Sequence, residues 1–193
     1  MKWEGLTPPY STIVADPPWR YRVSRMTVRT GDRRNGAEDH YSTMAIDELA
    51  GLPVADLASP NAHLYMWVTN PKLYGDRGAR RSLNPCDVME AWGFTYITTL
   101  TWLKLGALGM GFYFRGETEH VLFGVRGKAP IPVELRERNW FQAPKTGHSR
   151  KPAVFGDLVE SVSPGPYVEL FARAPRLGWD SYGWGYELSR GTA

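Results

Sequence analysis

The sequence lacks several features that mark particular protein classes. It has a single cysteine, Cys86, which excludes an internal disulfide and a cysteine-based zinc site and fits a reducing, cytoplasmic compartment. No hydrophobic run approaches the length of a membrane span, and the first ten residues contain no signal-peptide core, so we expect no membrane partner. No phosphate-binding loop of the form G-x-x-x-x-G-K is present, which argues against generic nucleotide binding.

Length and charge set broad limits on what remains. A chain of 193 residues suits one α/β domain, and we expect a single domain over residues 1–193. The formal net charge of +3 suggests a polyanionic partner without establishing one. Eight tryptophans are many for this length, and most should lie in the core because aromatic rings bury large apolar areas.

The most informative stretch is Ser11–Trp19, which reads S-T-I-V-A-D-P-P-W. Its apolar, β-branched first half predicts a short buried strand. Asp16, Pro17, Pro18 and Trp19 end that strand, because two prolines remove the donors of a sheet ladder. An acid, two rigid residues and a large aromatic ring therefore follow a buried strand, where open α/β sheets bind their ligands.

These four residues suit recognition of the exocyclic amine of a nucleobase. The Asp16 carboxylate can accept a hydrogen bond from an amino group, and Pro17 and Pro18 leave bare carbonyl acceptors in a fixed orientation. Trp19 offers a flat face for stacking, worth about 1–3 kcal/mol per base in single-strand binders. The alternative is a strand end with an Asp cap, a proline turn and a packed Trp. The rarity of D-P-P-W favours the functional interpretation.

Apolar patterns elsewhere in the chain alternate between strands and helices. Runs of apolar and β-branched residues predict strands at Ala62–Val68, Phe94–Leu103, Val121–Val125 and Tyr167–Phe171. Helical spacing predicts helices at Ile46–Leu57, Pro85–Gly93 and Val154–Val162. Residues from about 127 to 150 are rich in proline and charge, and we expect an irregular excursion over the surface.

D-P-P-W after an apolar strand is the signature of amino-group methyltransferases that use S-adenosylmethionine, and the surrounding sequence resembles the MT-A70 family of N6-adenine methyltransferases. The resemblance extends from Thr12 to Glu187 as an ordered series of matched segments. It implies an α/β, Rossmann-like class I methyltransferase fold with helices on both faces of a mainly parallel sheet. The motif order is permuted, because the pocket motif comes first and the cofactor strand last.

The resemblance also implies the site residues. It makes S-adenosylmethionine the cofactor, released as S-adenosylhomocysteine, with no metal. Catalysis falls to the D-P-P-W residues Asp16, Pro17, Pro18 and Trp19. Matched segments assign the cofactor contacts to Asp16, Lys151, Glu169, Leu170, Phe171, Arg173, Gly183 and Trp184. Substrate contacts fall to Trp19, Tyr41 and Lys104, together with Arg22 and Arg25 in the segment after the motif.

Local physics supports two of these assignments. Basic residues just before a helix oppose its dipole, so Lys151, ahead of the helix expected at Val154–Val162, indicates an anion nearby. A glutamate in a buried strand costs several kcal/mol unless it is paired. We therefore expect Glu169 to have a donor partner, whether Arg173, Lys151 or a ligand ribose.

Other positions leave alternatives open. Arg20–His40 is rich in arginine and has no apolar period, which predicts a mobile loop. It is either a solvated basic loop or, as we favour, a lid that contacts phosphates. Tyr41 borders the adenine pocket or merely packs, and Lys104 has a substrate-side role or is simply exposed.

Two features bear on metal and cofactor binding. Glu119 and His120 could suggest a metal pair, but adjacent strand residues point to opposite faces, so we expect no metal there. The family carries the same E-H pair, and the resemblance therefore implies a structural or pocket-edge role. The family usually has an Asn near the tail glycines, where this chain has Trp184, unless Tyr186 or Glu187 replaces it. This departure predicts altered cofactor contacts.

We therefore predict methyl transfer from S-adenosylmethionine to the N6 amino group of adenine in nucleic acid. DNA is favoured over RNA by analogy with compact bacterial and phage members of the family. RNA adenine methylation is one alternative. Another is a non-catalytic nucleic-acid-binding scaffold, which the missing Asn favours and the intact D-P-P-W opposes. The sequence leaves a homodimer or a heterodimer open.

Overall fold

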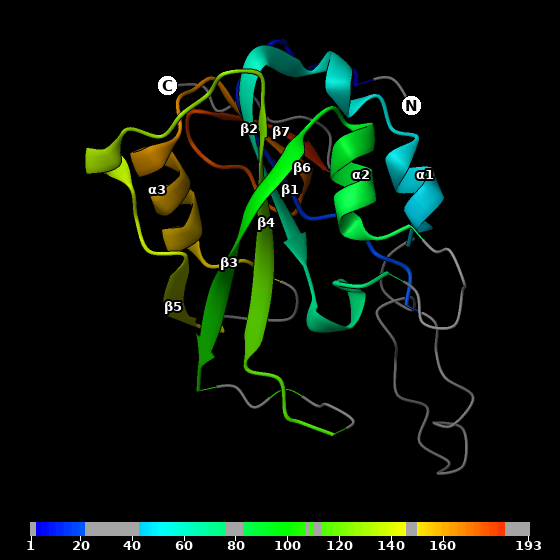
Figure 1. The fold of residues 1–193 in the computed structure, drawn as a ribbon, viewed down its shortest axis with the longest axis vertical. Coiled ribbons are helices and arrows are strands. Elements are labelled where there is room, and N and C mark those ends of the chain that lie inside the picture. The colour runs from blue at the N-terminus through cyan, green and yellow to red at the C-terminus, as the bar shows by residue number, and fades with distance from the viewer. Residues whose placement is uncertain are drawn as a thin grey trace.

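The fold is a mixed β-sheet with helices on both faces, as the computed structural model shows for residues 3–21, 43–75, 83–106, 109, 113–145 and 150–183 (Figure 1). The strands are β1 Tyr10–Ala15, β2 Ala58–Val68, β3 Thr95–Leu105, β4 Thr118–Arg126, β5 Trp140–Pro144, β6 Tyr167–Ala172 and β7 Trp179–Gly183. The helices are α1 Ile46–Ala50, α2 Pro85–Ala91 and α3 Ala153–Val162. Short 3-10 turns lie at Val54–Asp56, Asn70–Lys72 and Val133–Leu135.

The strand order is β5-β3-β4-β2-β1-β6-β7, and the carboxyl ends of most strands lie at the same edge of the sheet. β1 pairs in parallel with β2 and β6, β6 with β7, and β3 with β5. Only β4 among these strands runs the other way, antiparallel to both β2 and β3. The carboxyl ends of the six like-oriented strands and the amino end of β4 therefore meet at one edge, called here the carboxyl edge. This arrangement confirms the expected α/β fold with a mainly parallel sheet.

Two apolar layers pack the sheet between its helices. Ile13 and Leu64 lie in the core cluster on the side of α1 and α2. Val14 and Tyr65, the next residues along the same strands, lie in the cluster on the side of α3. Successive strand residues point to opposite faces, and both faces of β1 and β2 are covered. Central strands that are covered on both faces have continuous apolar sequences, and this pattern is why they could be predicted from the sequence.

Local signals set both ends of α2, and of these only Gly93 was predicted. The Asn84 side chain accepts a hydrogen bond from the Cys86 N–H at 2.8 Å, and the Asp87 carboxylate accepts one from the Asn84 N–H at 2.6 Å. This reciprocal arrangement is a capping box. Beyond the last turn Gly93 adopts a φ of +84°, which favours glycine, so it ends the helix as predicted.

Three elements differ from the sequence-based expectation. The helix expected at Ile46–Leu57 stops at Ala50, because Gly51 and Pro53 interrupt it, and a 3-10 turn follows. The stretch expected to be irregular contains β5, a short edge strand that pairs with β3. The tail interpreted for its glycines forms the other edge strand, β7. No helix in the described part of the chain is long and apolar enough to cross a membrane.

Candidate active site

A row of alternating charges lies at the carboxyl edge. Asp16 directly follows β1, Lys104 lies near the end of β3, and Glu119 lies at the start of the antiparallel β4. Lys151 precedes α3, and Arg173 directly follows β6. Five separate segments thus bring three cations and two carboxylates together, and we call these five residues the charged cluster.

Short contacts link the charged cluster into one network. The Lys151 Nζ atom lies 3.0 Å from Asp16 Oδ1 and 2.7 Å from Glu119 Oε1. Glu119 Oε2 lies 2.9 Å from Lys104 Nζ, and Asp16 Oδ2 lies 3.6 Å from Arg173 Nε. Only 10% of each carboxylate side chain is exposed, so little solvent screens these pairs.

Burial and pairing compete in setting the charges of the cluster. Burial raises the pKa of Glu119, but the ammonium groups of Lys151 and Lys104 outweigh it and hold that pKa below its ordinary value. Burial lowers the pKa of Lys151, whereas Asp16 and Glu119 raise it, and the net pKa lies above the ordinary value. Glu119 and Lys151 are therefore both ionised at neutral pH.

Aromatic rings form a wall beside the two lysines. Lys151 Nζ lies 4.8 Å from the ring centroid of Trp67, and Lys104 Nζ lies 5.1 Å from that of Trp102. Both rings are buried in the apolar layer on the α3 side. Cation–π attraction on this wall helps to hold the two ammonium groups at the carboxyl edge.

Glu169 lies beside the cluster with an unusual charge state. It occupies β6, in register with Val14 on one side and Ser181 on the other. Burial, reinforced by the negative charge of Asp16, raises its pKa to about 7. Among the described residues no hydrogen bond to its carboxylate is present, and Lys151 pairs with Asp16 and Glu119 instead. A ligand ribose, another of the expected donors, stays a prediction.

Ser181 is a second polar group that lacks a partner at this position. Its Oγ atom is buried and forms no hydrogen bond within the described residues. Because Glu169 and Ser181 are register partners on parallel strands, their side chains lie on the same face. An acceptor and a hydroxyl side by side without partners suit a ligand that carries hydroxyl groups.

The D-P-P-W residues are more tightly bound into the protein than the sequence suggested. Trp19 is only 5% exposed, and its Nε1–H donates to the Trp67 carbonyl at 2.9 Å. The Pro17 carbonyl accepts from the Trp19 N–H, and the Pro18 carbonyl accepts from the Met44 N–H, each at 2.8 Å. The expectation of bare carbonyls is therefore wrong, although each oxygen retains a second lone pair. Little of the Trp19 face is open for stacking.

Met44 returns the chain to the motif. It forms an isolated parallel bridge with Trp19, and its carbonyl accepts from the Arg20 N–H at 3.1 Å. The described residues on either side of the predicted basic loop thus lie together beside D-P-P-W, and residues 22–42, which make up nearly all of that loop, lie outside the described residues. Four of the predicted site residues lie outside the described residues, namely Arg22, Arg25, Tyr41 and Trp184.

The remaining predicted cofactor residues lie along β6 and β7. The Leu170 side chain is buried in the core, and its carbonyl accepts from the Asp16 N–H at 3.2 Å. Phe171 adopts a φ of +62°, which is rare for a bulky residue, and the β6–β7 register shifts there. Gly183 pairs with Ala172 at the end of β7. Strained residues of this kind concentrate at functional sites.

Glu119 lies at the centre of the charged cluster, where it pairs with two lysines. The resemblance implied a structural or pocket-edge role for it and named no partner. The signal that identified Glu169, a carboxylate on a buried strand, applies equally to Glu119. Its neighbour His120 points elsewhere, toward Thr101 and Asn70, as alternation along a strand requires.

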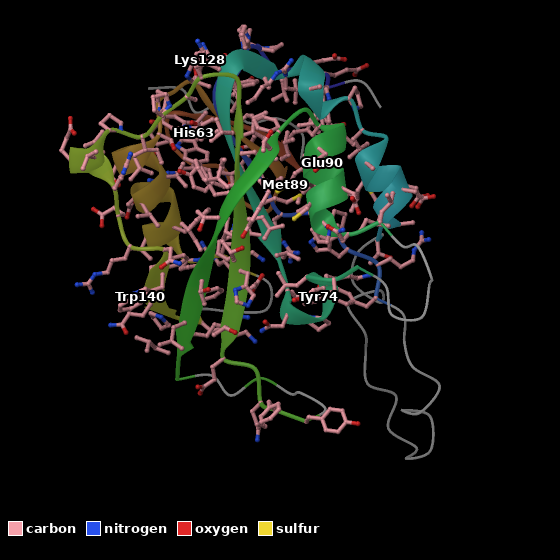
Figure 2. All side chains as sticks on the ribbon, viewed as in Figure 1. His63, Tyr74, Met89, Glu90, Lys128 and Trp140 are labelled. Atoms are coloured by element: carbon pink, nitrogen blue, oxygen red, sulfur yellow. The ribbon has the colours of Figure 1, made fainter. Side chains whose placement is uncertain are left out.

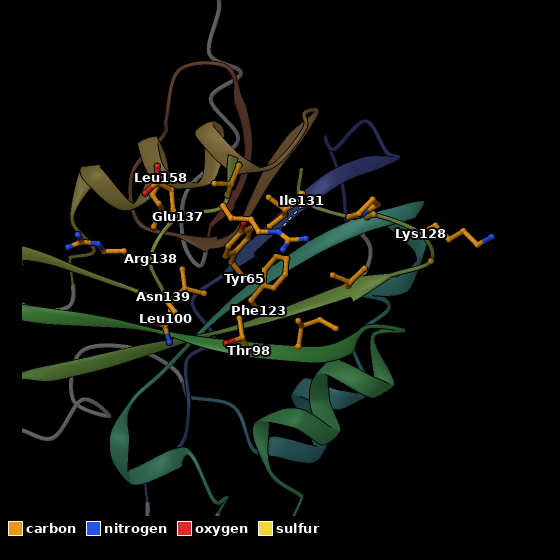
Figure 3. Close-up of a pocket in the computed structure, with 17 residues that line it drawn as sticks. Tyr65, Thr98, Leu100, Phe123, Lys128, Ile131, Glu137, Arg138, Asn139 and Leu158 are labelled. Carbon is orange, nitrogen blue, oxygen red and sulfur yellow. Dashed lines mark hydrogen bonds between the residues drawn. The ribbon is translucent and has the colours of Figure 1, made fainter. Parts of the chain in front are cut away.

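A separate cavity of about 750 Å³ lies on the α3 side of the sheet (Figure 3). Tyr65, Leu100, Phe123 and Leu158 line it with apolar surface, and residues 127–131 and 136–139 close it. No member of the charged cluster lines this cavity. The charged cluster at the carboxyl edge and this apolar cavity are therefore different places.

Comparisons with known proteins indicate one family. The family model MT-A70 matches residues 10–187. The chain is 32% identical over 193 residues to the type II methyltransferase M.MunI of a Mycoplasma species, covering 93% of this chain and 78% of that protein. It is 28% identical over 191 residues to the human N(6)-adenine-specific methyltransferase METTL4, covering 90% of this chain and 37% of that protein.

A third relative acts on RNA by name. The chain is 28% identical over 189 residues to the N6-methyladenosine RNA methyltransferase MTA1 of Cryphonectria parasitica, covering 91% of this chain and 51% of that protein. It thus spans most of the bacterial relative and about a third to a half of the two eukaryotic ones. The charged cluster, D-P-P-W and Glu169 all lie inside the family match, and the chain belongs to the MT-A70 family.

Proposed function

We propose that this MT-A70 methyltransferase transfers a methyl group from S-adenosylmethionine to the N6 amino group of adenine in nucleic acid. The observation that carries the proposal is the buried Asp16 carboxylate, held between Lys151 and Arg173 at the start of D-P-P-W. A carboxylate fixed in this way is an acceptor aimed at an amine. The names of two of the relatives specify N6 of adenine and support the same reaction.

The residues at the carboxyl edge fit the parts of S-adenosylmethionine. Its amino-acid end carries an ammonium and a carboxylate, which suit Asp16 on one side and Lys151 or Arg173 on the other. Its ribose carries two hydroxyls, which suit the Glu169 carboxylate and the Ser181 hydroxyl, neither of which has a hydrogen-bond partner among the described residues. Leu170, Phe171 and Gly183 would bound this part of the pocket, and Gly183 would allow close backbone approach.

The chemistry divides between the cofactor and the chain. S-adenosylmethionine, when bound, supplies a methyl carbon on a cationic sulfur that a neutral amine can accept without a covalent enzyme intermediate. Asp16 accepts one N–H of the adenine amino group, and the second lone pair of the Pro17 carbonyl accepts the other. These contacts fix the amine and increase the availability of its lone pair. Asp16 is also placed to take the proton that the nitrogen releases, so catalysis is mainly positioning and electrostatics.

Trp19 has an anchoring role in this proposal. Its ring is packed in the core and its N–H is bonded to Trp67, so stacking a base on it would require the ring to leave the core. The buried ring instead holds Pro17 and Pro18 at the strand end. Lys104 acts through Glu119, which it pairs with, and so supports the position of Lys151.

DNA is the favoured substrate, and residues 1–193 form one methyltransferase domain in this proposal. On duplex DNA the target adenine must leave the stack to reach Asp16, as for other base-modifying enzymes. Tyr41, Arg22 and Arg25 remain candidates for contacts to the extruded nucleotide, and Trp184 for contacts to the cofactor. A homodimer or a heterodimer would supply further nucleic-acid contacts.

The test uses labelled S-adenosylmethionine with unmethylated duplex DNA, single-stranded DNA and RNA, followed by nucleoside analysis. N6-methyladenine in DNA is the expected product. N6-methyladenine found only in RNA would show that RNA, and not DNA, is the substrate. Failure to form product in any polymer, together with no cofactor binding by calorimetry, would contradict the enzyme and support a nucleic-acid-binding scaffold.

A further inference from the structure

Two aromatic side chains stand exposed between β3 and β4. Tyr113 is 92% exposed and Phe114 is 90% exposed, and Arg115 follows them directly. Single exposed apolar residues are common on protein surfaces and need no explanation. Two adjacent aromatic rings with almost all of their surface in water, next to a cation, are a stronger signal for a binding surface.

Hydrogen bonds tie the segment that carries these two rings to the end of β3. The Lys104 N–H donates to the Glu117 carbonyl at 2.7 Å, and the Gly109 N–H donates to the Gly116 carbonyl at 3.0 Å. Arg115 Nε donates to the Gly109 carbonyl at 3.0 Å. A Cβ atom on Gly109 would lie 2.5 Å from the Gly116 oxygen, so glycine is needed for this close approach.

The exposed pair lies at the edge where the chemistry takes place. The backbone N–H of Lys104 bonds to Glu117, near the exposed pair, and its side chain forms an ion pair with Glu119 in the charged cluster. Figure 1 shows the segment leading into β4 extending past the sheet at the end toward which the arrows of β2 and β3 point. The five residue-to-residue steps from Phe114 to Glu119 can span at most about 17 Å, which is about five base steps of a duplex.

We propose that Tyr113 and Phe114 stack on, or wedge between, the bases beside the target adenine. Aromatic faces bind bases irrespective of sequence, and apolar wedges stabilise unstacked steps in distorted duplexes. Extrusion of the target base leaves a gap in the stack that such rings fill. Trp19 is buried and offers little stacking surface, so the base contacts come from elsewhere on this edge. Arg115 adds a cation suited to the flanking phosphates.

The inference rests on the proposed function, and the binding test separates the two. Tyr113→Ala, Phe114→Ala and the double variant are compared with Leu177→Ala, an exposed apolar residue just before β7, at the opposite edge of the sheet. Binding of a fluorescent single-stranded oligodeoxynucleotide is measured by anisotropy, which needs no catalysis. Each aromatic substitution should weaken binding about tenfold. The control should bind as the wild type does, and cofactor affinity should be unchanged in all variants.

A second readout locates the contact. In a duplex whose methylated adenine has been mapped, 2-aminopurine beside that adenine should be quenched by the wild type and not by the double variant. The KM for this duplex should rise in the double variant much more than kcat falls. The single variant Phe114→Trp, which keeps an aromatic ring at this position, should have the wild-type KM and kcat.

Three outcomes would overturn the inference. Unchanged oligonucleotide binding by the double variant contradicts base contact directly. Self-association that is lost in the double variant, by sedimentation, with DNA binding unchanged would assign the pair to a second copy of the chain. Quenching that persists in the double variant would place the stacking groups elsewhere. Absence of methyl transfer by the wild type, with aromatic-dependent oligonucleotide binding retained, would count against the proposed function and for this surface.

Discussion

The Lys151 ammonium lies 3.0 Å from Asp16 Oδ1, and this contact ties the segment before α3 to the end of β1. The same ammonium lies 2.7 Å from Glu119 Oε1 on β4. One cation therefore neutralises two carboxylates that are mostly out of solvent. Removing it leaves both carboxylates close together without their shared partner, which is the costly way to break a buried pair.

Replacing Lys151 by methionine should therefore impair stability and cofactor binding together. We expect a loss of about 3–5 kcal/mol in the free energy of unfolding, because two buried carboxylates lose their shared cation. Affinity for S-adenosylmethionine should fall at least tenfold. Urea unfolding and calorimetry measure the two effects. Lys128→Met, at an exposed lysine far from this edge in Figure 2, is the matched control and should change neither. Wild-type values in Lys151→Met would contradict the assigned network.

Glu169 should make the cofactor-free protein less stable as the pH rises. Its pKa is raised from 4.5 to about 7 in the fold, so the folded state keeps a proton that the unfolded chain loses between these values. Stability from this group is therefore fully present below pH 4.5 and falls by on the order of 3 kcal/mol as the pH passes 7. Urea unfolding of Glu169→Gln across this range should lack that decline. Glu134→Gln, at an exposed glutamate, should retain it.

Cofactor binding should release the proton that Glu169 holds. Donor hydroxyls favour the ionised carboxylate, so binding near pH 7 should lower the pKa of Glu169. Calorimetry in buffers of different ionisation enthalpy should detect a proton released by the wild type and none released by Glu169→Gln. Equal proton release in the two proteins would show that the ligand contacts some other titrating group.

His63 should have the opposite pH dependence. It lies toward the end of the molecule away from Tyr74 and Trp140 (Figure 2), with Nδ1 2.7 Å from Ser163 Oγ and Nε2 2.8 Å from the Ala129 carbonyl. Burial lowers its pKa, so the folded state resists protonation while the unfolded chain accepts a proton below about pH 6.5. Its contribution is fully present above that pH and is lost as the pH falls. Urea unfolding of His63→Gln and of the wild type at pH 5 and pH 8 measures the contribution of His63 to the change in the free energy of unfolding between these two pH values. A wild-type pH slope in the variant would contradict it.

Trp19 should matter to folding before it matters to catalysis. Trp19→Ala removes a buried ring and should cost about 3–5 kcal/mol in the free energy of unfolding. Trp140→Ala removes an exposed ring that contacts Arg138 and should cost about 1 kcal/mol or less. Trp19→Phe keeps most of the packing and loses only the hydrogen bond to Trp67. If Trp19→Phe were stable yet failed to bind nucleic acid, a stacking role would replace the anchoring role.

The sequence predicted the central fold because its signals were local. The apolar run before Asp16, the glycine that ends α2 and the helical spacing of α3 each depend on a few neighbouring residues. Edge strands β5 and β7 were missed for the same reason. Each has five residues, and β5 ends in proline, so pairing with a neighbour decides their structure.

Contacts between side chains far apart in the sequence could not be predicted from local sequence signals. Glu119 and Lys151 are 32 positions apart and meet only because β4 runs against its neighbours. The burial of Trp19 depends on a carbonyl 48 positions away. A motif can therefore indicate the chemistry of a site, whereas the group that anchors the site and the group that faces the ligand are decided by the packed fold.

The most direct test compares methyl transfer by the wild type and by Asp16→Asn. Asparagine keeps the shape of Asp16 but loses the negative charge between Lys151 and Arg173. Both proteins are first shown by thermal unfolding to be folded at the assay temperature, then incubated with labelled S-adenosylmethionine and unmethylated DNA. We expect N6-methyladenine from the wild type and at least a hundredfold less from Asp16→Asn, in line with the typical loss on removing a key electrostatic group. Equal product from both proteins would contradict the assignment of the carboxyl edge as the methyl-transfer site.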